Sequence, residues 1–434
     1  MISWELTQRE REGRPIRVSM SGAGWMGTGF LAAVRHVPGM VVNVIADEDV
    51  AAARAAFLAA GVPPEQIAEA SAPGPAMDAL RAGQVVATGS YWLAAQLEAV
   101  DIVTDVTWSP ATGAETACAA IEHGKDVVLV NIEADVTVGR ILRRRAEQAG
   151  VLYSVSGGDE PGCLMELVDF VTALGYEVIA IGKGKNNPLD PSATPETVAE
   201  SARKADKDPY QVASYVDGTK TMFEMTCAAN ATSCLPVRRG MLGPEATLET
   251  VSQVFALEAD GGLTPHPGIV DFVQGEAMAG GVFVTVRIAD ERIQADLNYL
   301  KVGRGKYFTF FRPYHLWFLE APISIARAHL HRETTLVPLD RPVADVMAVA
   351  KRDLIPGETL DTFGGYTQYG VMDRAEVARG LNALPVGLAP GARVVRPVAR
   401  GEIITWDDVA LDKSSTVVRL RREQDAFDSQ LLKT

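Results

Sequence analysis

The sequence predicts an α/β protein that begins with a doubly wound parallel sheet, and three observations lead to this fold class. Short apolar segments alternate with helical patterns through residues 1–155. These segments are apolar throughout rather than alternately apolar and polar, which is typical of parallel strands covered on both faces. A glycine-rich turn directly follows the first of them, at residues 22–27. Together these observations predict a Rossmann-type domain over residues 1–155.

The elements of this first domain follow in order along the chain. A β-branched run that starts at Ile16 predicts the first strand, and the small residues of 28–37 predict the first helix. Further strands are expected at 41–46, 100–106, 126–131 and 151–155, and further helices at 113–123 and 135–149. Residues 51–94 are rich in alanine and interrupted by proline, and they are left unassigned.

Two more domains and a tail are predicted after this sheet. Residues 156–332 mix helical patterns with strand-like runs, which predicts an α+β substrate domain whose strand order stays open. The helices are expected at 163–174 and 219–233, and the strands at 176–181, 282–288 and 307–311. Residues 333–415 predict a small β domain, and residues 416–434 are a charged tail expected to be a surface helix or disordered.

The small β domain contains a weak internal repeat. Residues 351–360 resemble residues 396–404, and each copy combines a strand with a Gly-Glu turn. Two copies are too few for a solenoid. This part of the chain resembles the SAF domain, the antifreeze-like β-clip module, including the closing segment Thr405-Trp406-Asp407-Asp408-Val409.

Composition narrows the class of protein. Of the 434 residues, 47% are hydrophobic and 22% are charged, which is ordinary for a globular chain. The net charge is 41 − 55 = −14, and no basic run interleaved with aromatic residues occurs, so a nucleic-acid partner is not expected. The four cysteines lack C-x-x-C spacing, and no long apolar segment predicts a signal peptide or a membrane span. We expect a cytoplasmic protein that forms a homo-oligomer and binds a small molecule.

The glycine-rich turn reads Gly22-Ala23-Gly24-Trp25-Met26-Gly27, which is a G-x-G-x-x-G pattern between a strand and a helix. The first glycine allows the tight turn, the second lets backbone N–H groups approach a pyrophosphate, and the third lets the helix pack against the strand. Asp47 ends the second strand about 20 residues later, where a ribose-binding acid belongs. We expect these residues to bind a dinucleotide, and a turn that serves only packing is the alternative.

Three consecutive acids, Asp47, Glu48 and Asp49, favour NAD over NADP. A carboxylate at this place accepts a hydrogen bond from the ribose 2′-OH, whereas the 2′-phosphate of NADP requires a cation such as arginine. Glu48 and Asp49 are also explained as acids at a helix N-terminus, and Arg54 is close enough in sequence to fold back toward a phosphate. NAD is the preferred cofactor, and NADP stays the alternative.

Polar residues follow the later strands of the first domain, at the edge where ligands of doubly wound sheets bind. Asn131 and Glu133 follow one strand and Thr107 follows another, and we expect all three to contact the cofactor. The loop Ser156-Gly157-Gly158-Asp159-Glu160-Pro161-Gly162 comes after the last strand, and Glu160 is assigned to the catalytic set. An interdomain turn with acidic helix caps is the alternative.

A second candidate segment is the strand-like run that ends in Gly182-Lys183-Gly184-Lys185-Asn186. Lys183 and Lys185 are two positions apart, so they share one face of a strand. We expect them to hold the anionic end of a substrate, with Asn186 orienting it. Two lysines at a solvated strand end are the alternative.

A third candidate segment is the helix that begins after Asp217, which is a natural helix cap and is also assigned to the catalytic set. Lys220 and Glu224 lie one turn apart on this helix, and residues 225–235 carry no charge. The helix is therefore expected to be buried, with Lys220, assisted by Glu224, exchanging a proton with the substrate. An exposed salt bridge is the alternative.

These segments resemble the homoserine dehydrogenase superfamily, in particular its SAF-domain branch similar to deoxyxylulose-phosphate reductoisomerase-like oxidoreductases. The resemblance covers residues of about 15 to 410, and it rests on the Rossmann start and on three motifs: Gly-Asp-Glu-Pro-Gly, Gly-Lys-Gly-Lys-Asn and Arg-Pro-Tyr-His-Leu. Homoserine dehydrogenases carry Asp-Gly-x-Asp-Ala-x-x-Lys in the third segment, where this chain has Lys220 and Glu224 in reversed charge order. This departure implies an anionic or polyhydroxylated substrate without an amino group.

The resemblance implies an NAD(P)-dependent oxidoreductase in which hydride transfer is coupled to a ketol or carbon-skeleton shift on a sugar phosphate or branched sugar acid. A simple hydroxy-acid or alcohol dehydrogenase and a non-catalytic nucleotide-binding scaffold remain alternatives. No protein metal site is expected, because the six histidines lack ligand spacing.

Overall fold

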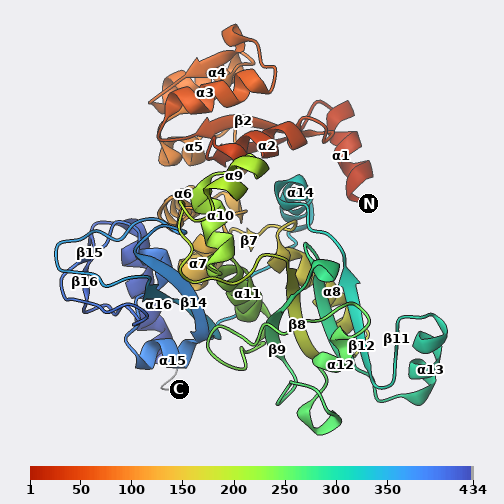
Figure 1. Ribbon diagram of the computed structural model, residues 1–434. Helices are drawn as coiled ribbons and strands as arrows, with labels where there is room; N and C mark the ends of the chain where they lie inside the picture. Colours follow the sequence, from red (N-terminus) through yellow and green to blue (C-terminus); the bar gives the residue numbers. More distant parts are fainter. Residues whose placement is uncertain (432–434) are drawn as a thin grey trace. The chain divides into compact units, whose positions relative to one another are not determined.

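The computed structural model describes residues 1–431, and the chain forms two compact units that are treated separately below (Figure 1). Unit 1 consists of Met1–Asp159, Leu316–Pro338 and Ser415–Phe427. Unit 2 consists of Glu160–His315, Leu339–Ser414 and the chain from Asp428 onward. The chain therefore passes between the units several times, so neither unit is one continuous segment.

Unit 1 is built on a seven-stranded parallel sheet with the strand order β3-β4-β2-β1-β5-β6-β7. The strands are β1 (Ile16–Ser21), β2 (Met40–Ala46), β3 (Ile67–Glu69), β4 (Val85–Thr88), β5 (Ile102–Asp105), β6 (Asp126–Leu129) and β7 (Tyr153–Val155). The strand order reverses at β1, which has β2 on one side and β5 on the other. In such sheets a ligand binds beyond the carboxyl ends of the strands at this reversal. The predicted doubly wound parallel sheet is confirmed.

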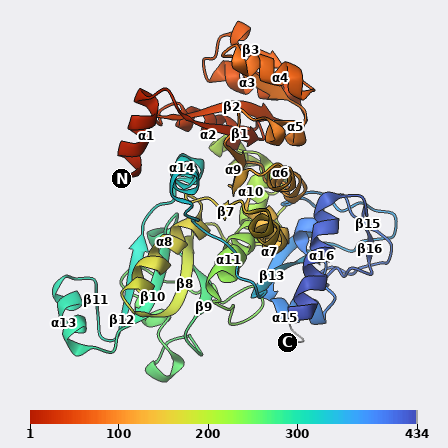
Figure 2. The same ribbon diagram turned by 180° about the vertical axis from the view of Figure 1, so that it is seen from behind.

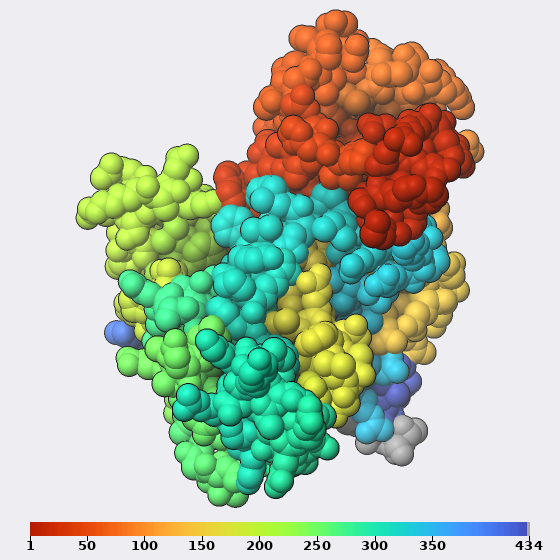
Figure 3. Space-filling view, turned by 90° about the vertical axis from the view of Figure 1, so that its right-hand side faces the viewer, coloured from red at the N-terminus to blue at the C-terminus, as the bar shows by residue number. Residues whose placement is uncertain are grey.

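The helices of unit 1 are α1 (Ile2–Arg11), α2 (Trp25–Val34), α3 (Val50–Ala59), α4 (Pro73–Arg81), α5 (Tyr91–Gln96), α6 (Pro110–Glu122), α7 (Ile132–Ala149), α14 (Ala321–His331) and α16 (Thr416–Leu431), of which the part up to Phe427 belongs here. Most of these helices connect the strands, whereas α1 precedes the first strand and α14 and α16 come from later parts of the chain. Short 3₁₀ turns lie at Pro64–Gln66 and Trp317–Leu319. Helix α14, from a distant part of the sequence, packs beside α1, and Figure 3 shows the two in contact.

Two parts of unit 1 go beyond the sequence expectations. The unassigned region 51–94 contains α3, α4 and α5 and also β3 and β4, whose 3 and 4 residues are too few to show a period. Residues 416–431 of the charged tail form the helix α16, and its apolar side chains Val417, Val418 and Leu420 are buried. Gln424 on the same helix accepts a hydrogen bond from the backbone N–H of Ile141 on α7, at 3.1 Å.

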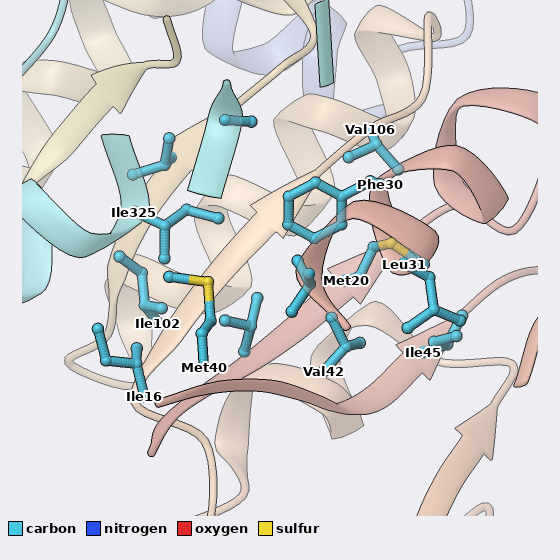
Figure 4. Close-up of a cluster of buried hydrophobic side chains, with 14 of the residues drawn as sticks. Ile16, Met20, Phe30, Leu31, Met40, Val42, Ile45, Ile102, Val106 and Ile325 are labelled. Carbon is cyan, nitrogen blue, oxygen red and sulfur yellow. The ribbon is translucent and has the colours of Figure 1, made fainter. Parts of the chain in front are cut away.

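The core of unit 1 lies between the first strands and the helices that follow them (Figure 4). Phe30 on α2 is completely buried among Met20, Val42 and Val106 and their neighbours. Ile325 of α14 belongs to the same cluster. This core holds β1 and α2, and therefore the glycine-rich turn between them, in a fixed geometry.

Unit 2 contains a five-stranded mixed sheet with the order β11-β12-β10-β8-β9, seen from behind in Figure 2. Its strands are β8 (Glu177–Lys185), β9 (Ile269–Gln274), β10 (Val282–Arg287), β11 (Gly303–Arg304) and β12 (Tyr307–Arg312). Strand β8 is parallel to β9 and antiparallel to β10. The helices are α8 (Glu160–Ala173), α9 (Ala199–Ala205), α10 (Pro209–Val216), α11 (Thr219–Thr232), α12 (Val251–Val254), α13 (Glu291–Tyr299) and α15 (Ala375–Gly380), with 3₁₀ turns at Glu258–Asp260, Glu276–Met278 and Val386–Leu388.

The C-terminal part of unit 2 is a small β structure. A hairpin pairs β13 (Ala344–Ala350) with β14 (Gln368–Arg374), and β15 (Arg393–Val394) pairs with β16 (Val409–Ala410). The two copies of the internal repeat contact each other, because Leu354 of the first forms an antiparallel bridge with Val398 of the second. Helix α11 packs on β13 and β14, so this β structure supports a helix that carries candidate catalytic residues.

No helix among residues 1–431 is long and apolar enough to cross a membrane.

The buried Phe30 makes the core of unit 1 testable. Replacing Phe30 by Ala should lower the free energy of unfolding by about 3–5 kcal/mol, because the cavity it leaves is enclosed by rigid strands. Leu58→Ala is the control, since Leu58 is 41% exposed and should change the value by about 0.5 kcal/mol or less. Urea unfolding of both variants measures the difference, and equal values would contradict the described core.

Candidate functional site

The glycine-rich turn of unit 1 has the geometry of a phosphate-binding loop. A Cβ at Gly22, where φ is +100°, would lie 2.7 Å from Cγ2 of Thr107, and a Cβ at Gly27 would lie 2.2 Å from the carbonyl oxygen of Gly22. Gly22 and Gly27 are therefore required by the packing of the turn itself. Gly24 is different, because nothing lies within 4 Å of a Cβ built there. The turn leaves its middle glycine open to a ligand, at the N-terminus of α2.

The two residues after Gly24 form the first turn of α2. Trp25 is 47% exposed, and its ring makes edge contacts with Trp317 and Phe318 at centroid distances of 5.5 and 5.6 Å. Met26 packs against the core of unit 1. The backbone N–H groups of this turn, rather than the side chains, are the groups that suit a diphosphate.

Asp47 lies beside the glycine turn, as the sequence spacing predicts. Its Oδ2 accepts a hydrogen bond from the backbone N–H of Ala23 at 2.7 Å, and its Oδ1 accepts one from the N–H of Asp49 at 2.9 Å. A carboxylate has about four lone-pair positions, so Asp47 retains acceptors for ribose hydroxyls. Asp49 caps α3 through the N–H of Ala51, which confirms the helix-cap interpretation for this acid.

Arg54 does not fold back toward Asp47. Its guanidinium donates to the carbonyl oxygens of Ile67 and Pro64 at 3.0 and 3.3 Å, and it lies 3.8 Å from the carboxylate of Glu69. These partners hold the arginine at β3. It is therefore not positioned to bind a 2′-phosphate at Asp47.

Thr107 and Asn131 meet at a carboxylate that the sequence analysis did not select, that of Asp105. Asn131 donates to Asp105 Oδ2 at 2.8 Å, and Thr107 donates to Asp105 through both its N–H and its hydroxyl, at 3.0 and 3.2 Å. Glu133, in the first turn of α7, is 5% exposed and raises the pKa of Asp105 further. Asp105 ends a strand in a local Thr-Asp-Val-Thr sequence that carries no motif, so nothing in the sequence marks it.

The candidate catalytic residues of unit 2 converge on Lys183. Its ammonium forms ion pairs with Glu160, the first residue of α8, and with Glu224 on α11. Lys183 is 8% exposed, Glu160 4% and Glu224 2%. Burial alone would lower the pKa of Lys183, but the two carboxylates outweigh burial and raise it. Lys183 is a fixed cation at every physiological pH.

This arrangement corrects the expectation that Lys183 holds an anionic substrate. The ammonium of Lys183 is already neutralised by two carboxylates, so little of its charge is left to hold an anion. The pairing of Glu224 also differs from the expectation, because the structure joins it to Lys183 on β8, 41 positions away. Lys220, in the first turn of α11, is half-buried.

Lys185 ends strand β8 in a different environment. Its Nζ donates a hydrogen bond to the carbonyl oxygen of Tyr215 at 2.6 Å. Burial, and then the positive charge of Lys183, lower the pKa of Lys185 to about 8. An amine with this pKa exchanges protons near neutral pH. Asn186 follows directly and is exposed.

Asp217 has a structural partner. Its carboxylate is 1% exposed and lies 2.8 Å from Nζ of Lys351, which also donates to the carbonyl oxygens of Ala193 and Gly365. Asp217 also accepts from the N–H of Thr219 at 2.8 Å, which supports the start of α11. Burial raises the pKa of Asp217, and Lys351 opposes this shift. We therefore assign Asp217 to positioning α11 rather than to contact with a substrate.

His315 is a site residue that the sequence analysis missed. Its Nδ1 contacts the carbonyl oxygen of Gly280 at 2.8 Å, so Nδ1 carries the proton, and Nε2 lies 3.6 Å from Oε1 of Glu160. The Arg-Pro-Tyr-His motif was the available signal. The prediction that the chain has no metal site rests on the spacing of histidines in the sequence. The approach of His315 to Glu160 is not visible in that spacing, so the prediction stays untested.

Comparison with known proteins agrees with a redox enzyme. Residues 158–321 match the family model described as oxidoreductase DRL, catalytic domain. A search of the curated proteins gives no match. The matched part includes Glu160, Lys183, Lys185, Glu224 and His315.

Among solved structures, the chain is similar to a protein described as a probable dehydrogenase from Thermotoga maritima, with 13% identity, 73% of this chain and 90% of that chain covered, and a TM-score of 0.40. It is similar to GenD2 from gentamicin A biosynthesis, solved in complex with NAD, with 14% identity, coverage of 75% and 90%, and a TM-score of 0.37. It is also similar to an NAD binding oxidoreductase from Klebsiella pneumoniae, with 16% identity, coverage of 64% and 64%, and a TM-score of 0.32.

The doubly wound sheet with its glycine turn, together with the oxidoreductase family model, defines an NAD(P)-dependent oxidoreductase.

Two glycines of the turn allow a matched test of cofactor binding. Gly24→Ala should leave the unfolding temperature unchanged, because its φ of −72° suits alanine and its Cβ meets nothing. It should weaken NADH binding by about tenfold, because the methyl group occupies the surface that the diphosphate approaches. Gly27→Ala should instead lower the stability by about 1–3 kcal/mol, because its Cβ meets a backbone oxygen.

Fluorescence titration with NADH and a thermal melt measure both quantities for each variant. Unchanged NADH affinity in a folded Gly24→Ala variant would contradict the assignment of this turn to cofactor binding.

Proposed function

We propose that the protein uses NAD to interconvert a hydroxyl and a carbonyl group on a small, hydroxylated, anionic substrate. The observation that carries this proposal is the open Gly24 beside Asp47 in a chain that also buries a lysine able to exchange protons, Lys185. Gly24 and Asp47 are placed to bind a dinucleotide. Lys185 can carry out the proton transfer that must accompany hydride transfer.

The preference for NAD is supported by the carboxylate of Asp47 and by the position of Arg54. Asp47 is the acceptor that ribose hydroxyls need, and it would repel a 2′-phosphate. Arg54, the nearest cation considered from the sequence, is bound to carbonyl oxygens at β3. NADP would therefore meet a negative charge without a compensating arginine.

The residues present fit a nicotinamide dinucleotide, whose nicotinamide ring accepts or donates a hydride when bound. The backbone of Gly24, Trp25 and Met26 would hold its diphosphate, and Asp47 would hold a ribose. Thr107 and Asn131 follow β5 and β6, in the other half of the sheet, and would hold the nicotinamide half.

Lys185 is the residue that we assign to proton transfer. Its pKa of about 8 allows a neutral amine, whereas the two carboxylates keep Lys183 protonated. The hydrogen bond from its Nζ to Tyr215 orients the amine. In the oxidative direction Lys185 takes the proton of the substrate hydroxyl, and in the reductive direction it returns that proton. This assignment replaces Lys220, which with Asn186 is proposed to contact the anionic end of the substrate.

A coupled ketol shift, which the resemblance of the sequence implies, is the second candidate reaction. Such a shift needs a base for one hydroxyl and a positive charge beside the neighbouring carbonyl oxygen. Lys185 supplies the base. The charge of Lys183 is already neutralised by Glu160 and Glu224, so Lys220 is the lysine proposed to supply the positive charge. Simple dehydrogenation needs only the base.

A substrate screen tests the proposed function. Sugar acids, sugar phosphates and simple hydroxy acids are offered with NAD or NADP in turn, and nicotinamide absorbance is followed. We expect turnover with an anionic polyol and a kcat/KM at least about tenfold higher with NAD than with NADP, because one misplaced charge is worth about 1.4 kcal/mol or more. Analysis of the product skeleton separates a ketol shift from simple oxidation. Equal use of NADP would contradict the role of Asp47.

The assignment of Lys185 predicts a pH profile. In the oxidative direction kcat should rise with pH and level off above about 8, because only the neutral amine accepts the hydroxyl proton. In the reductive direction kcat should fall over the same range, because the protonated amine is then the donor. Lys185→Met should lose this dependence together with at least about 100-fold in kcat, while NADH binding is retained.

Lys204→Met is the matched control, since Lys204 is exposed on α9 and paired only with Glu200 among the contacts described. A Lys185→Met variant with normal turnover and a normal pH profile would exclude Lys185 as the proton-transfer group.

A further inference from the structure

Asp105 is a buried carboxylate whose recorded hydrogen-bond donors are all neutral. It ends β5, the neighbour of β1 at the point where the strand order reverses, and it is 0% exposed. Three donors point at its two oxygens: the N–H and hydroxyl of Thr107 and the side-chain amide of Asn131. A buried carboxylate lowers the stability of the fold unless donors satisfy it, so these three hydrogen bonds are needed to keep Asp105 ionised in this position.

The donors connect Asp105 to three loops at the ligand-binding edge of the sheet. Thr107 lies in the loop after β5, and its methyl group is the one that a Cβ at Gly22 would strike at 2.7 Å, so it touches the glycine turn. Asn131 caps α7 by accepting from the N–H of Ala134 at 2.9 Å, and it also donates to the carbonyl oxygen of Ser109 at the start of α6. One carboxylate therefore sets the loops after β1, β5 and β6.

Two of these loops, those after β5 and β6, belong to the half of the sheet that would receive the nicotinamide. The glycine turn and Asp47 follow β1 and β2 and suit the adenosine half of a dinucleotide, whereas Thr107 and Asn131 follow β5 and β6. We infer that Asp105 is a positioning residue for the nicotinamide half of the cofactor, and that its ionised form is the one that binds NAD⁺ tightly. This inference rests on the proposed dinucleotide function.

The ionisation of Asp105 lies in an accessible range of pH. Burial raises the pKa of Asp105 to about 6, against the opposing hydrogen bonds from Thr107 and Asn131. The titratable groups that face it are Glu133 on α7, which raises its pKa further, and Tyr91 on α5, whose own pKa is raised to about 12 by burial and nearby carboxylates. A proton on Asp105 removes the negative charge that strengthens its hydrogen bonds from Thr107 and Asn131, so these contacts weaken.

The sign of the effect distinguishes positioning from folding. Because the pKa of Asp105 is higher in the folded chain than its ordinary value of 3.8, its contribution to stability decreases as pH rises from about 4 to about 6. NAD⁺ affinity is expected to increase with pH around the same folded-state pKa, as the carboxylate forms. Acidification therefore weakens binding while this group favours the folded state.

The experiment is a calorimetric titration of the full-length protein with NAD⁺ and with ADP, between pH 5 and 7.5. ADP tests the adenosine half alone. For the unmodified protein we expect NAD⁺ affinity to fall by about fivefold at pH 5, with a midpoint near 6. ADP affinity should follow only the ionisation of its own terminal phosphate, so it should be the same in the unmodified protein and in Asp105→Asn at each pH. Asp105→Asn should bind NAD⁺ about tenfold more weakly at pH 7.5 and without this pH dependence, because its amide opposes the amide of Asn131. It should bind ADP normally.

Thr107→Val is the second variant, in case Asp105→Asn does not fold. Valine keeps the methyl group against Gly22 and removes only the hydroxyl donor, so NAD⁺ binding should weaken by about threefold and ADP binding should not change. Loss or absence of ADP binding in the unmodified protein overturns the proposed dinucleotide function itself. Normal ADP binding with NAD⁺ affinity that is independent of pH, or unchanged in both variants, overturns the inference about Asp105 alone.

Discussion

The ammonium of Lys183 is the interaction on which the candidate catalytic part of unit 2 depends. It joins a strand to the first residue of α8 and to the middle of α11 through Glu160 and Glu224. Two buried ionised carboxylates without a cation would cost several kcal/mol each, so this lysine stabilises the packing of β8, α8 and α11. The same constraint decides the chemistry. A lysine saturated by two carboxylates stays charged, and the neighbouring Lys185 becomes the amine that can lose a proton.

Unit 1 also has a buried charged group that joins several elements, but this group is an anion. Asp105 is a single buried carboxylate that collects donors from the loops after β5 and β6, and through Thr107 it reaches the glycine turn after β1. In both units a buried charged side chain with several partners connects segments that are distant in sequence. Such a network is rigid because each partner satisfies a group that would otherwise be buried and unpaired. The Asp217–Lys351 pair, which fastens the start of α11, is a third case.

The parts of the fold that could be predicted from the sequence are those with a strong local pattern. Strands such as Val100–Val106 and helices such as 135–149 were expected because continuous apolar runs and helical periods are readable in a window of about 11–18 residues. The short strands β3 and β4 were missed because a few residues show no period. The partner of Glu224 was also missed. Lys220 lies one turn away and is visible in the sequence, whereas Lys183 meets Glu224 only when β8 and α11 pack.

The sequence by itself determined the class of fold, the glycine turn and the acid at the end of the second strand, because each depends on backbone conformation within a short segment. Only the tertiary structure decided which charges are neutralised. In the folded chain Lys183 is paired with carboxylates instead of being free to hold an anion, and Asp217 is paired with Lys351. Folding also places His315 near Glu160 and Asn131 in hydrogen-bond contact with Asp105. The physical reason is that the protonation and role of an ionisable group depend on burial and on neighbours a few ångströms away, which in these cases are far apart in the chain.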